Sequence, residues 1–219
     1  LISFLSTSVY AKEIIVLTVN GVINPPHAEY TIKGIQKAHE QNAEAVIIQL
    51  DTPGGLDTSM RSIIKEMLNS QIPIVVYVSP KGARAASAGA FITLAAHIAA
   101  MAPGTNIGAA HPVAMGGEKM DKTMAEKITN DAVAYIKSIA KQRGRNIEWA
   151  EQAVRKSISS TETEALKLKV IDLIADDLNS LMKDINGMKV KTVRGEVTLN
   201  TKTAKINKIE MNFREKLLN

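Results

Sequence analysis

The chain has 219 residues, 45% of them hydrophobic, and a formal charge of +5, which excludes an intrinsically disordered protein and predicts one main folded domain. It contains no cysteine, so thiol nucleophiles, disulfides and cysteine-bound metals are excluded. The charge excess lies in residues 183–219, where nine Lys or Arg stand against four Asp or Glu. A neutral body with a basic end and no aromatic-interleaved basic motif argues against nucleic acid as a partner. The basic tail faces either an anionic membrane surface or solvent.

The first eleven residues, LISFLSTSVYA, are typical of the end of a secretory signal. They are apolar and close with small residues at Val9 and Ala11, the two positions that a signal peptidase recognises. We therefore expect residues 1–11 to be a signal remnant and the rest of the chain to work outside the cytoplasm. The alternative is an ordinary N-terminal strand or linker.

The next part of the chain alternates between strand and helix patterns. Short apolar runs at 14–19, 45–50 and 72–78 predict strands buried on both faces. Residues 28–41 and 58–70 between them carry apolar side chains at helical spacing. This alternation predicts βαβ units and a mostly parallel sheet.

The second half continues with further elements of both kinds. We predict a strand at 98–101, a long helix at 122–143, and a helix followed by a short strand within 161–175. A hairpin turning at Arg194-Gly195 is predicted near the end. The predicted fold is thus α/β, with repeated βαβ units, a mostly parallel sheet and a long helical segment. Residues 12–177 form the main domain, and 178–219 form a basic extension of a helix and a hairpin.

Two loops rich in small residues follow predicted strands, where sites of α/β sheets form. The first is DTPGG at 51–55, and the second is GARAASAGA at 82–90. Ser87 begins a predicted helix, where unpaired N–H groups and the helix dipole favour negative charge. The N–H of Ala88 and a backbone N–H from the Gly54-Gly55 pair therefore suit an oxyanion created by Ser87. The alternative is that Ser87 only caps the helix.

Four motifs in fixed order carry a resemblance to a known family. They are DTPGG at 51–55, AASAGA at 85–90, MAPGTNIGAAHP at 101–112 and KITNDA at 127–132. Together they resemble the NfeD family of membrane-bound serine peptidases, whose catalytic domain is related to Clp protease, signal peptide peptidase A and the crotonase fold. The resemblance covers about residues 13–177 and weakens over the basic tail. Lys169 departs from the family pattern, which usually has glycine at this position. How the preceding helix ends is therefore left open.

The resemblance implies a Ser/Lys dyad. Ser87 would be the nucleophile, Lys127 the general base, and the N–H groups of Gly55 and Ala88 the oxyanion hole. A lysine takes a serine proton only when its amine is neutral, which requires burial or nearby positive charge. Apolar neighbours on its helix favour partial burial of Lys127. The alternative is an exposed lysine that pairs with Asp131 one turn on.

A histidine is the rival base. His111 follows Ser87 by 24 residues, a distance similar to that in Clp relatives, and Asp131 is the acid that would orient it. The KITNDA match favours Lys127. No set of His, Asp and Glu shows metal-ligand spacing, so we predict no metal and no cofactor.

The substrate is expected to be an extended apolar peptide. The residues expected to contact it are Gly54, Leu56, Phe91, Ile107, His111 and Met115. Residues 113–122, with two adjacent glycines, are either a lid over this substrate or an ordinary connection.

The resemblance also implies partners and a location. NfeD-type peptidases act on hydrophobic segments of membrane proteins, with stomatin-like proteins as partners, so we expect membrane association with the catalytic domain on the extracytoplasmic side. A homodimer or larger oligomer is expected by analogy with Clp and crotonase relatives. Two other classes stay open. One is a crotonase-like acyl-CoA enzyme, although residues 85–90 offer it no carboxylate, and the other is a non-catalytic module that binds a membrane partner.

Overall fold

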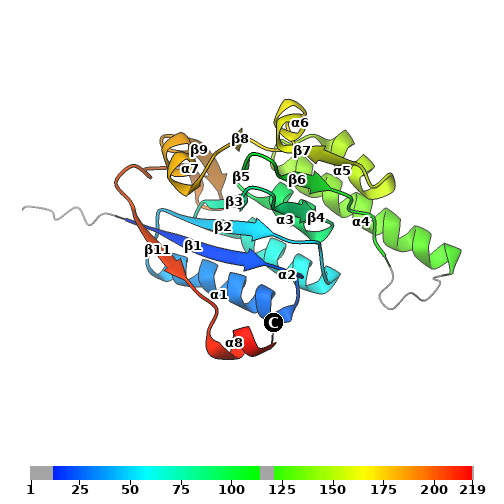
Figure 1. The fold of residues 1–219 in the computed structure, drawn as a ribbon, viewed down its shortest axis with the longest axis horizontal. Coiled ribbons are helices and arrows are strands. Elements are labelled where there is room, and N and C mark those ends of the chain that lie inside the picture. Colours follow the sequence, from blue (N-terminus) through cyan, green and yellow to red (C-terminus); the bar gives the residue numbers. More distant parts are fainter. Residues whose placement is uncertain (1–11, 114–120, 219) are drawn as a thin grey trace, which may run out of the picture.

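The computed structural model describes residues 12–113 and 121–218 (Figure 1). The expected signal remnant at 1–11, Met115 and most of the expected 113–122 loop lie outside the described residues. Within the described ranges, no helix combines the length and hydrophobicity that crossing a membrane requires.

The centre of the molecule is a six-stranded sheet in the order β11-β1-β2-β3-β5-β8, and every neighbouring pair is parallel. This confirms the predicted parallel sheet. In its register Val16 lies opposite Ile47, and Ile47 lies opposite Val75. The strands are β1 (Glu13–Asn20), β2 (Ala45–Asp51), β3 (Ile74–Val78), β5 (Ile98–Met101), β8 (Leu173–Ile174) and β11 (Lys205–Ile209).

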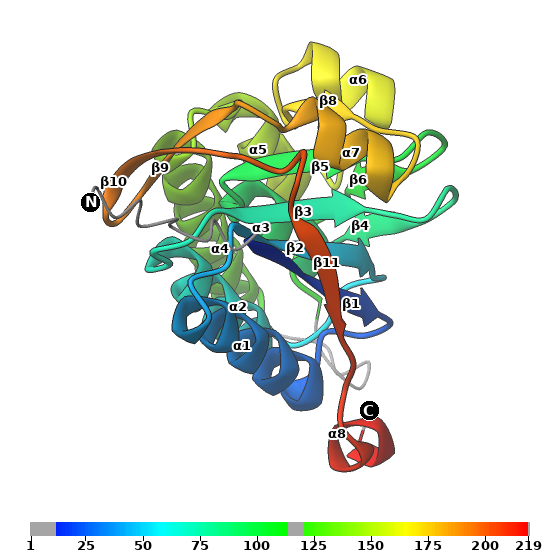
Figure 2. The same cartoon turned by 90° about the vertical axis from the view of Figure 1, so that its left-hand side faces the viewer.

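Helices α1 and α3 pack on one face of this sheet with α2 between them, and α4 and α5 pack outside α3 and share the same core (Figure 2). Asn24 caps the first helix by accepting a hydrogen bond from the N–H of His27, and two prolines follow it. Asp121 caps the long helix in the same way, by accepting from the N–H of Met124. The helices are α1 (Pro25–Glu40), α2 (Asp57–Leu68), α3 (Ala88–Ala95), α4 (Lys122–Gln142) and α5 (Ile147–Arg155).

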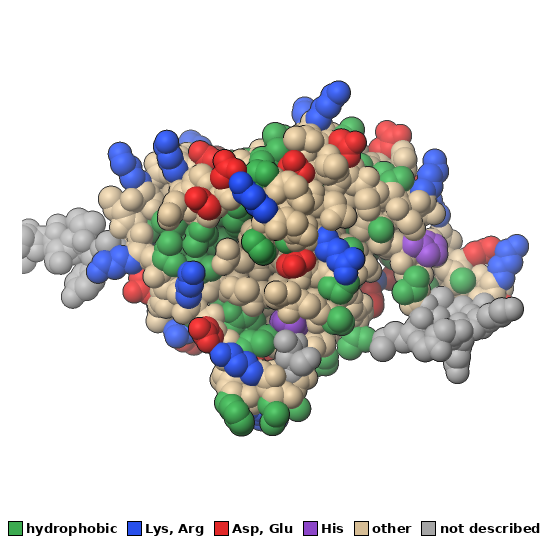
Figure 3. Space-filling model, viewed as in Figure 1, with side chains coloured by type: hydrophobic (Ala, Val, Ile, Leu, Met, Phe, Trp, Pro, Cys, Tyr) green, Lys and Arg blue, Asp and Glu red, His purple; other side chains and the backbone are tan. Residues whose placement is uncertain are grey.

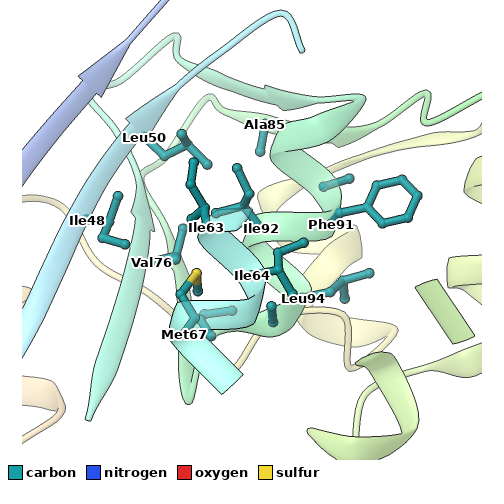
Figure 4. Packing of buried hydrophobic residues seen from close by; sticks show 14 of the residues in the cluster. Ile48, Leu50, Ile63, Ile64, Met67, Val76, Ala85, Phe91, Ile92 and Leu94 are labelled. Carbon is teal, nitrogen blue, oxygen red and sulfur yellow. The ribbon is translucent and has the colours of Figure 1, made fainter. Parts of the chain in front are cut away.

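Alternate residues of each strand enter two separate cores, as the pleat of a strand requires. Ile15 and Leu17 pack with the five helices in the larger core, while Ile14 and Val16 pack in a smaller core on the other face. Helix α7 (Leu178–Asp184) contributes Leu181 to this smaller core. Figure 4 shows the larger core where β2 and β3 meet α2 and α3. Burial on both faces explains why the strands read as continuous apolar runs.

A small second sheet lies beyond the carboxyl ends of the main strands. It joins β4 (Arg84–Ala86), β6 (Asn106–Gly108) and β7 (Ser159–Thr161). β4 and β6 are parallel, and β6 and β7 are antiparallel. Strands of three residues are too short for a periodic pattern, so the sequence analysis did not predict them. They position the serine loop described below.

The C-terminal region is integrated with the main sheet. The predicted hairpin is present as β9 (Lys189–Thr192) and β10 (Gly195–Thr198), and its two-residue turn lies one residue earlier than predicted. Strand β11 pairs with β1 along the sheet edge, where the hydroxyl of Tyr30 donates to the carbonyl of Ile209 at 2.5 Å. Helix α6 (Glu162–Lys167) follows β7, and α8 (Phe213–Leu218) lies against α1.

Candidate active site

Ser87 occupies the turn between β4 and α3. Its backbone has φ 51° and ψ −114°, a region that residues with a side chain rarely adopt. Its N–H donates to the carbonyl of Gly108 at 3.0 Å, and its carbonyl accepts from Ala90 at 3.0 Å. Its side chain makes no capping hydrogen bond to α3. The hydroxyl of Ser87 is therefore not used as a helix cap, and the strained backbone is of the kind that proteins keep at functional sites.

The DTPGG loop packs directly on this turn. The N–H of Thr52 donates to the carbonyl of Arg84 at 2.8 Å, and the N–H of Ala86 donates to the carbonyl of Thr52 at 3.0 Å. Gly54 then lies beside Ser87. A Cβ atom on Gly54 would lie 2.7 Å from the Cβ and 3.1 Å from the Oγ of Ser87. The absence of a side chain thus lets the loop backbone approach the hydroxyl.

Gly55 is held from the other side by Ile23. The N–H of Ile23 donates to Gly54 at 2.8 Å, and its carbonyl accepts from Leu56 at 2.8 Å. A Cβ atom on Gly55 would lie 2.1 Å from the carbonyl oxygen of Ile23. Because the bonds to Ile23 flank Gly55 in a parallel bridge, its own N–H points away from Ile23.

Two backbone donors near Ser87 are left without acceptors. Ala88 is the first residue of α3, so its N–H has no partner inside the helix. Across residues 12–113 and 121–218, no acceptor is found for the N–H of Ala88 or of Gly55. Unpaired N–H groups on both flanks of a serine are the elements from which an oxyanion hole is built.

A cavity of about 630 Å³ opens next to Gly55 and reaches α4. Lys127 lies on the opposite wall and is exposed, so the partial burial that its apolar neighbours favour is not present in this structure. No ion pair of Lys127 is found within the described ranges. The residues that line the cavity are Gly55, Leu56, Asp57, Thr58, Arg61, Pro112, Val113, Lys127, Ile128, Asp131 and Ala132.

Comparison with known proteins places the chain in a family. Residues 13–207 match the family described as NfeD1b, N-terminal domain. The chain belongs to this NfeD1b family. It is 43% identical over 221 residues to membrane-bound protease PH1510 of Pyrococcus horikoshii, and 28% identical over 222 residues to membrane protein NfeD1b of Bacillus subtilis. These matches cover 98% and 94% of the chain but 50% and 49% of the relatives, so the chain spans about half the length of the curated relatives it matches.

Solved structures confirm the fold. The chain is similar to a 1510-N membrane-bound stomatin-specific protease, solved as a lysine-to-alanine mutant in complex with a substrate peptide. The TM-score is 0.87 at 40% identity, with 95% of this chain and 96% of that chain covered. A serine-to-alanine mutant of the same protease gives a TM-score of 0.84 at 41% identity, covering 91% of this chain and 98% of that chain. The Clp/crotonase-like fold expected from the sequence is thus confirmed.

Arg61 connects the two walls of the cavity in this NfeD1b domain. Its Nε donates to Asp57 at 2.8 Å, and its Nη2 donates to Asp131 on α4. Its guanidinium lies 4.3 Å from the ring centroid of Tyr135. Asp131 therefore pairs with Arg61, not with Lys127 as the alternative interpretation had it. The sequence does not point to Arg61, because its partner Asp131 lies on a distant helix and no local motif marks it.

His111 is exposed, and its Nδ1 lies 2.9 Å from the carbonyl oxygen of Val154. A carbonyl only accepts, so Nδ1 carries a proton. Asp131, the acid suggested to orient His111, contacts Arg61. No hydrogen bond between His111 and Ser87 is found in the described part of the chain.

The expected substrate contacts divide into two groups. Gly54 lies against Ser87 and Leu56 lines the cavity, as predicted for neighbours of the site. Phe91 and Ile107 are buried, and neither lines the cavity. Phe91 stacks on Tyr135 with ring centroids 6.1 Å apart. Helix α3 and strand β6 turn these two side chains into the core, and their expected contact with substrate stays a prediction.

Proposed function

We propose that this NfeD1b domain is a serine endopeptidase with a Ser/Lys dyad. The observation that carries the proposal is the geometry around Ser87. The strained backbone of this serine, its hydroxyl free of any capping bond and the adjoining Gly54-Gly55 backbone together suit a nucleophile that must meet a peptide. The lysine-to-alanine and serine-to-alanine mutants made of the 1510-N protease are consistent with such a dyad.

In this mechanism the Oγ of Ser87 attacks the carbonyl carbon of the scissile peptide. Lys127 takes the hydroxyl proton and later gives a proton to the departing amine. The N–H groups of Gly55 and Ala88 stabilise the oxyanion, each by about 2.7–4 kcal/mol as in comparable sites. A peptide that fills the cavity would displace water from Lys127, and a lysine kept from water is neutral more readily.

We propose apolar segments of a stomatin-like membrane protein as the substrate. The cavity between Gly55 and Lys127 has apolar lining from Leu56, Val113 and Ile128. The charges on its walls at Asp57, Arg61 and Asp131 already neutralise one another in part. The 1510-N relative is named a stomatin-specific protease, which agrees with this chemistry.

We further propose that the domain associates with the membrane, with the peptidase on the extracytoplasmic side. We also propose that it assembles into a homodimer or larger oligomer. Hydrophobic side chains gather on the outer side of α8 (Figure 3), where Phe213 is 83% and Leu217 is 73% exposed. Arg214 and Lys216 alternate with them on this short helix. An apolar surface with basic residues suits the interface of an anionic membrane. The names of both curated relatives describe membrane proteins.

Peptide hydrolysis tests the proposal. Wild type, Ser87→Ala, Lys127→Ala and His111→Ala are incubated with an unstructured apolar peptide from a stomatin-like protein, and the products are identified by mass. We expect no cleavage with Ser87→Ala or Lys127→Ala and substantial cleavage with His111→Ala. Loss of cleavage in Ser87→Ala and His111→Ala, but not in Lys127→Ala, would show that His111 and not Lys127 is the general base. Equal cleavage by Ser87→Ala and wild type would reject the peptidase mechanism.

A further inference from the structure

A second cavity, of about 430 Å³, lies at the opposite end of the sheet from Ser87. It is bounded by the ends of α2 and α4, by His97 just before β5, and by strand β9 of the hairpin. Ser87 follows the carboxyl ends of the strands, whereas His97 precedes the amino end of β5. The lining residues are Leu68, His97, Gln142, Arg143, Lys189, Val190, Lys191, Thr192 and Val193.

This cavity is surrounded by positive charge. Arg143, Lys189 and Lys191 line it, and no carboxylate does so among the described residues. Glu196 pairs with Lys189 at 3.0 Å, but both side chains are 65% exposed. An ion pair that exposed contributes little, so Lys189 stays available to a stronger anion.

The carboxylate of Asp172 is already used by Arg145. Arg145 is buried, and its Nη2 donates to the Oδ2 of Asp172 at 2.6 Å. The same oxygen accepts the N–H of Ala99 at 2.7 Å. Nη1 of Arg145 donates to the carbonyl of Ala96 at 3.0 Å. Asp172 therefore balances Arg145, and nothing in this group balances Arg143.

Arg143 is the uncompensated cation. Its Nε donates to the carbonyl of Ala95 at 2.8 Å, but neither of its terminal nitrogens has an acceptor within the described ranges. Nη2 is fully buried, where an unsatisfied donor is costly. Burial and the charge of Arg145 lower the pKa of Arg143 to about 10, which still leaves it charged at neutral pH.

His97 adds a neutral donor to the same cavity. Its Nδ1 accepts the N–H of Ile74 at 3.1 Å, so the ring proton is on Nε2. No acceptor for Nε2 is found in the described part of the chain. Burial, and then the charges of Arg143 and Arg145, lower the pKa of His97 to about 3, so the ring is neutral at working pH. The side chains of Arg143, Lys189, Lys191 and His97 therefore all offer hydrogen-bond donors to a ligand in this cavity.

We propose that this cavity is a binding site for a phosphate-type oxyanion, held by Arg143, Lys191 and the Nε2–H of His97. Nη1 of Arg143 has no acceptor within the described ranges and, unlike Nη2, is not fully buried, so it offers a charged donor to a phosphate oxygen, and a lysine adds a second charge. The phosphate group comes either from an anionic lipid headgroup or from a free phosphate. This site is independent of Ser87 and does not rest on the proposed peptidase activity.

The alternative is purely structural, since Arg143 and Arg145 also satisfy carbonyls at the end of α3. The test uses the 219-residue chain and inorganic phosphate, titrated by calorimetry against chloride at equal ionic strength. Lys191→Gln is the main variant, because Lys191 is exposed and its loss leaves the fold unchanged. Lys208→Gln is the matched control, an exposed lysine of the same basic region that does not line the cavity.

Saturable phosphate binding is expected, weakened about tenfold in Lys191→Gln and more in Arg143→Gln, with Lys208→Gln unchanged. Phosphatidylglycerol vesicles, compared with phosphatidylcholine vesicles, then distinguish the source. A larger loss of vesicle binding in Lys191→Gln than in Lys208→Gln indicates a lipid headgroup, and equal losses indicate free phosphate. No phosphate binding by wild type, or equal binding by Lys191→Gln and Lys208→Gln relative to wild type, overturns the proposal.

Discussion

The Cα of Gly54 faces Ser87 so closely that a Cβ atom on it would lie 2.7 Å from the serine Cβ. Real Cβ atoms do not approach other atoms this closely, and Gly54 also has φ +125°, which disfavours any side chain. The glycine of the DTPGG loop and Ser87 therefore depend on each other sterically. The first prediction follows from this contact.

Gly54→Ala should abolish peptide cleavage and destabilise the fold, because either the loop or Ser87 must move. A displacement of about 1 Å costs on the order of 100-fold in rate. Gly82→Ala is the matched control, since Gly82 also has a positive φ of +87° but nothing lies within 4 Å of its added Cβ. Both variants lose stability through backbone strain, and only Gly54→Ala should lose activity. Equal activities, measured on protein shown to be folded by circular dichroism, would contradict the steric argument.

Arg61 should be a positioning residue for Lys127. It ties Asp57 of α2 to Asp131 of α4, one helical turn after Lys127, and so holds the two cavity walls at a fixed separation. If Lys127 is the base as proposed, Arg61→Gln should misplace it and lower kcat about tenfold or more while the peptide KM changes less. Stability should fall by only about 1 kcal/mol, as its side chain is partly exposed.

The control for Arg61 is Arg155→Gln. Arg155 pairs with Glu151 and reaches Asn130 on α4, but it does not line the cavity. Its kinetics should match wild type. If Arg61→Gln and Arg155→Gln have the same kcat, Arg61 forms only a surface ion pair and does not position Lys127.

How far the sequence predicts this molecule depends on the range of the interactions involved. Apolar runs and helical spacing located β1, β2, β3, β5, α1, α2 and α4 to within a few residues. Strand β11 was missed, because its partner β1 lies almost the whole chain away and its exposed lysines hide the pattern. Sequence-local patterns carry no information about such pairings.

The same limit applies to the site. Ser87, Gly54 and Gly55 were found because small residues after a strand have a direct physical meaning, and the structure brings them together. The exposure of Lys127 could not be predicted, since it depends on how α4 packs and on what fills the cavity. The burial of Phe91 and Ile107 could not be predicted for a related reason. An apolar residue near a site in sequence is more often turned into the core than into the cavity.

Lys169 has a strained backbone. Its φ of 58° is left-handed, and its N–H donates to the carbonyl of Leu166 at 3.0 Å just after α6. A left-handed residue with a Cβ costs about 1 kcal/mol or more. Lys169→Gly should therefore raise the unfolding free energy by about 1 kcal/mol and the Tm by about 2–4 °C. Lys167→Gly, at the last residue of α6, should lower stability, by up to about 1 kcal/mol. If both substitutions destabilise, relief of left-handed strain at Lys169 is not the dominant effect.

The buried histidine next to the arginines should make the protein sensitive to acid. The pKa of His97 is lowered to about 3 by burial and by Arg143 and Arg145, whereas in the unfolded chain it titrates near 6.5. Between these two values the unfolded state binds a proton that the folded state does not. Stability therefore falls as pH falls from about 6 to 4, by at most about 1.4 kcal/mol per pH unit from this group.

His97→Asn should remove this part of the slope. The side-chain oxygen of asparagine can accept the N–H of Ile74 in place of Nδ1, and it does not titrate. Urea unfolding at pH 4, 5, 6 and 7 measures the slope for both proteins. We expect the variant to be less stable than wild type at pH 7, because packing is lost, and to lose less stability on acidification. Parallel stability curves for wild type and variant would show that His97 does not carry the acid sensitivity.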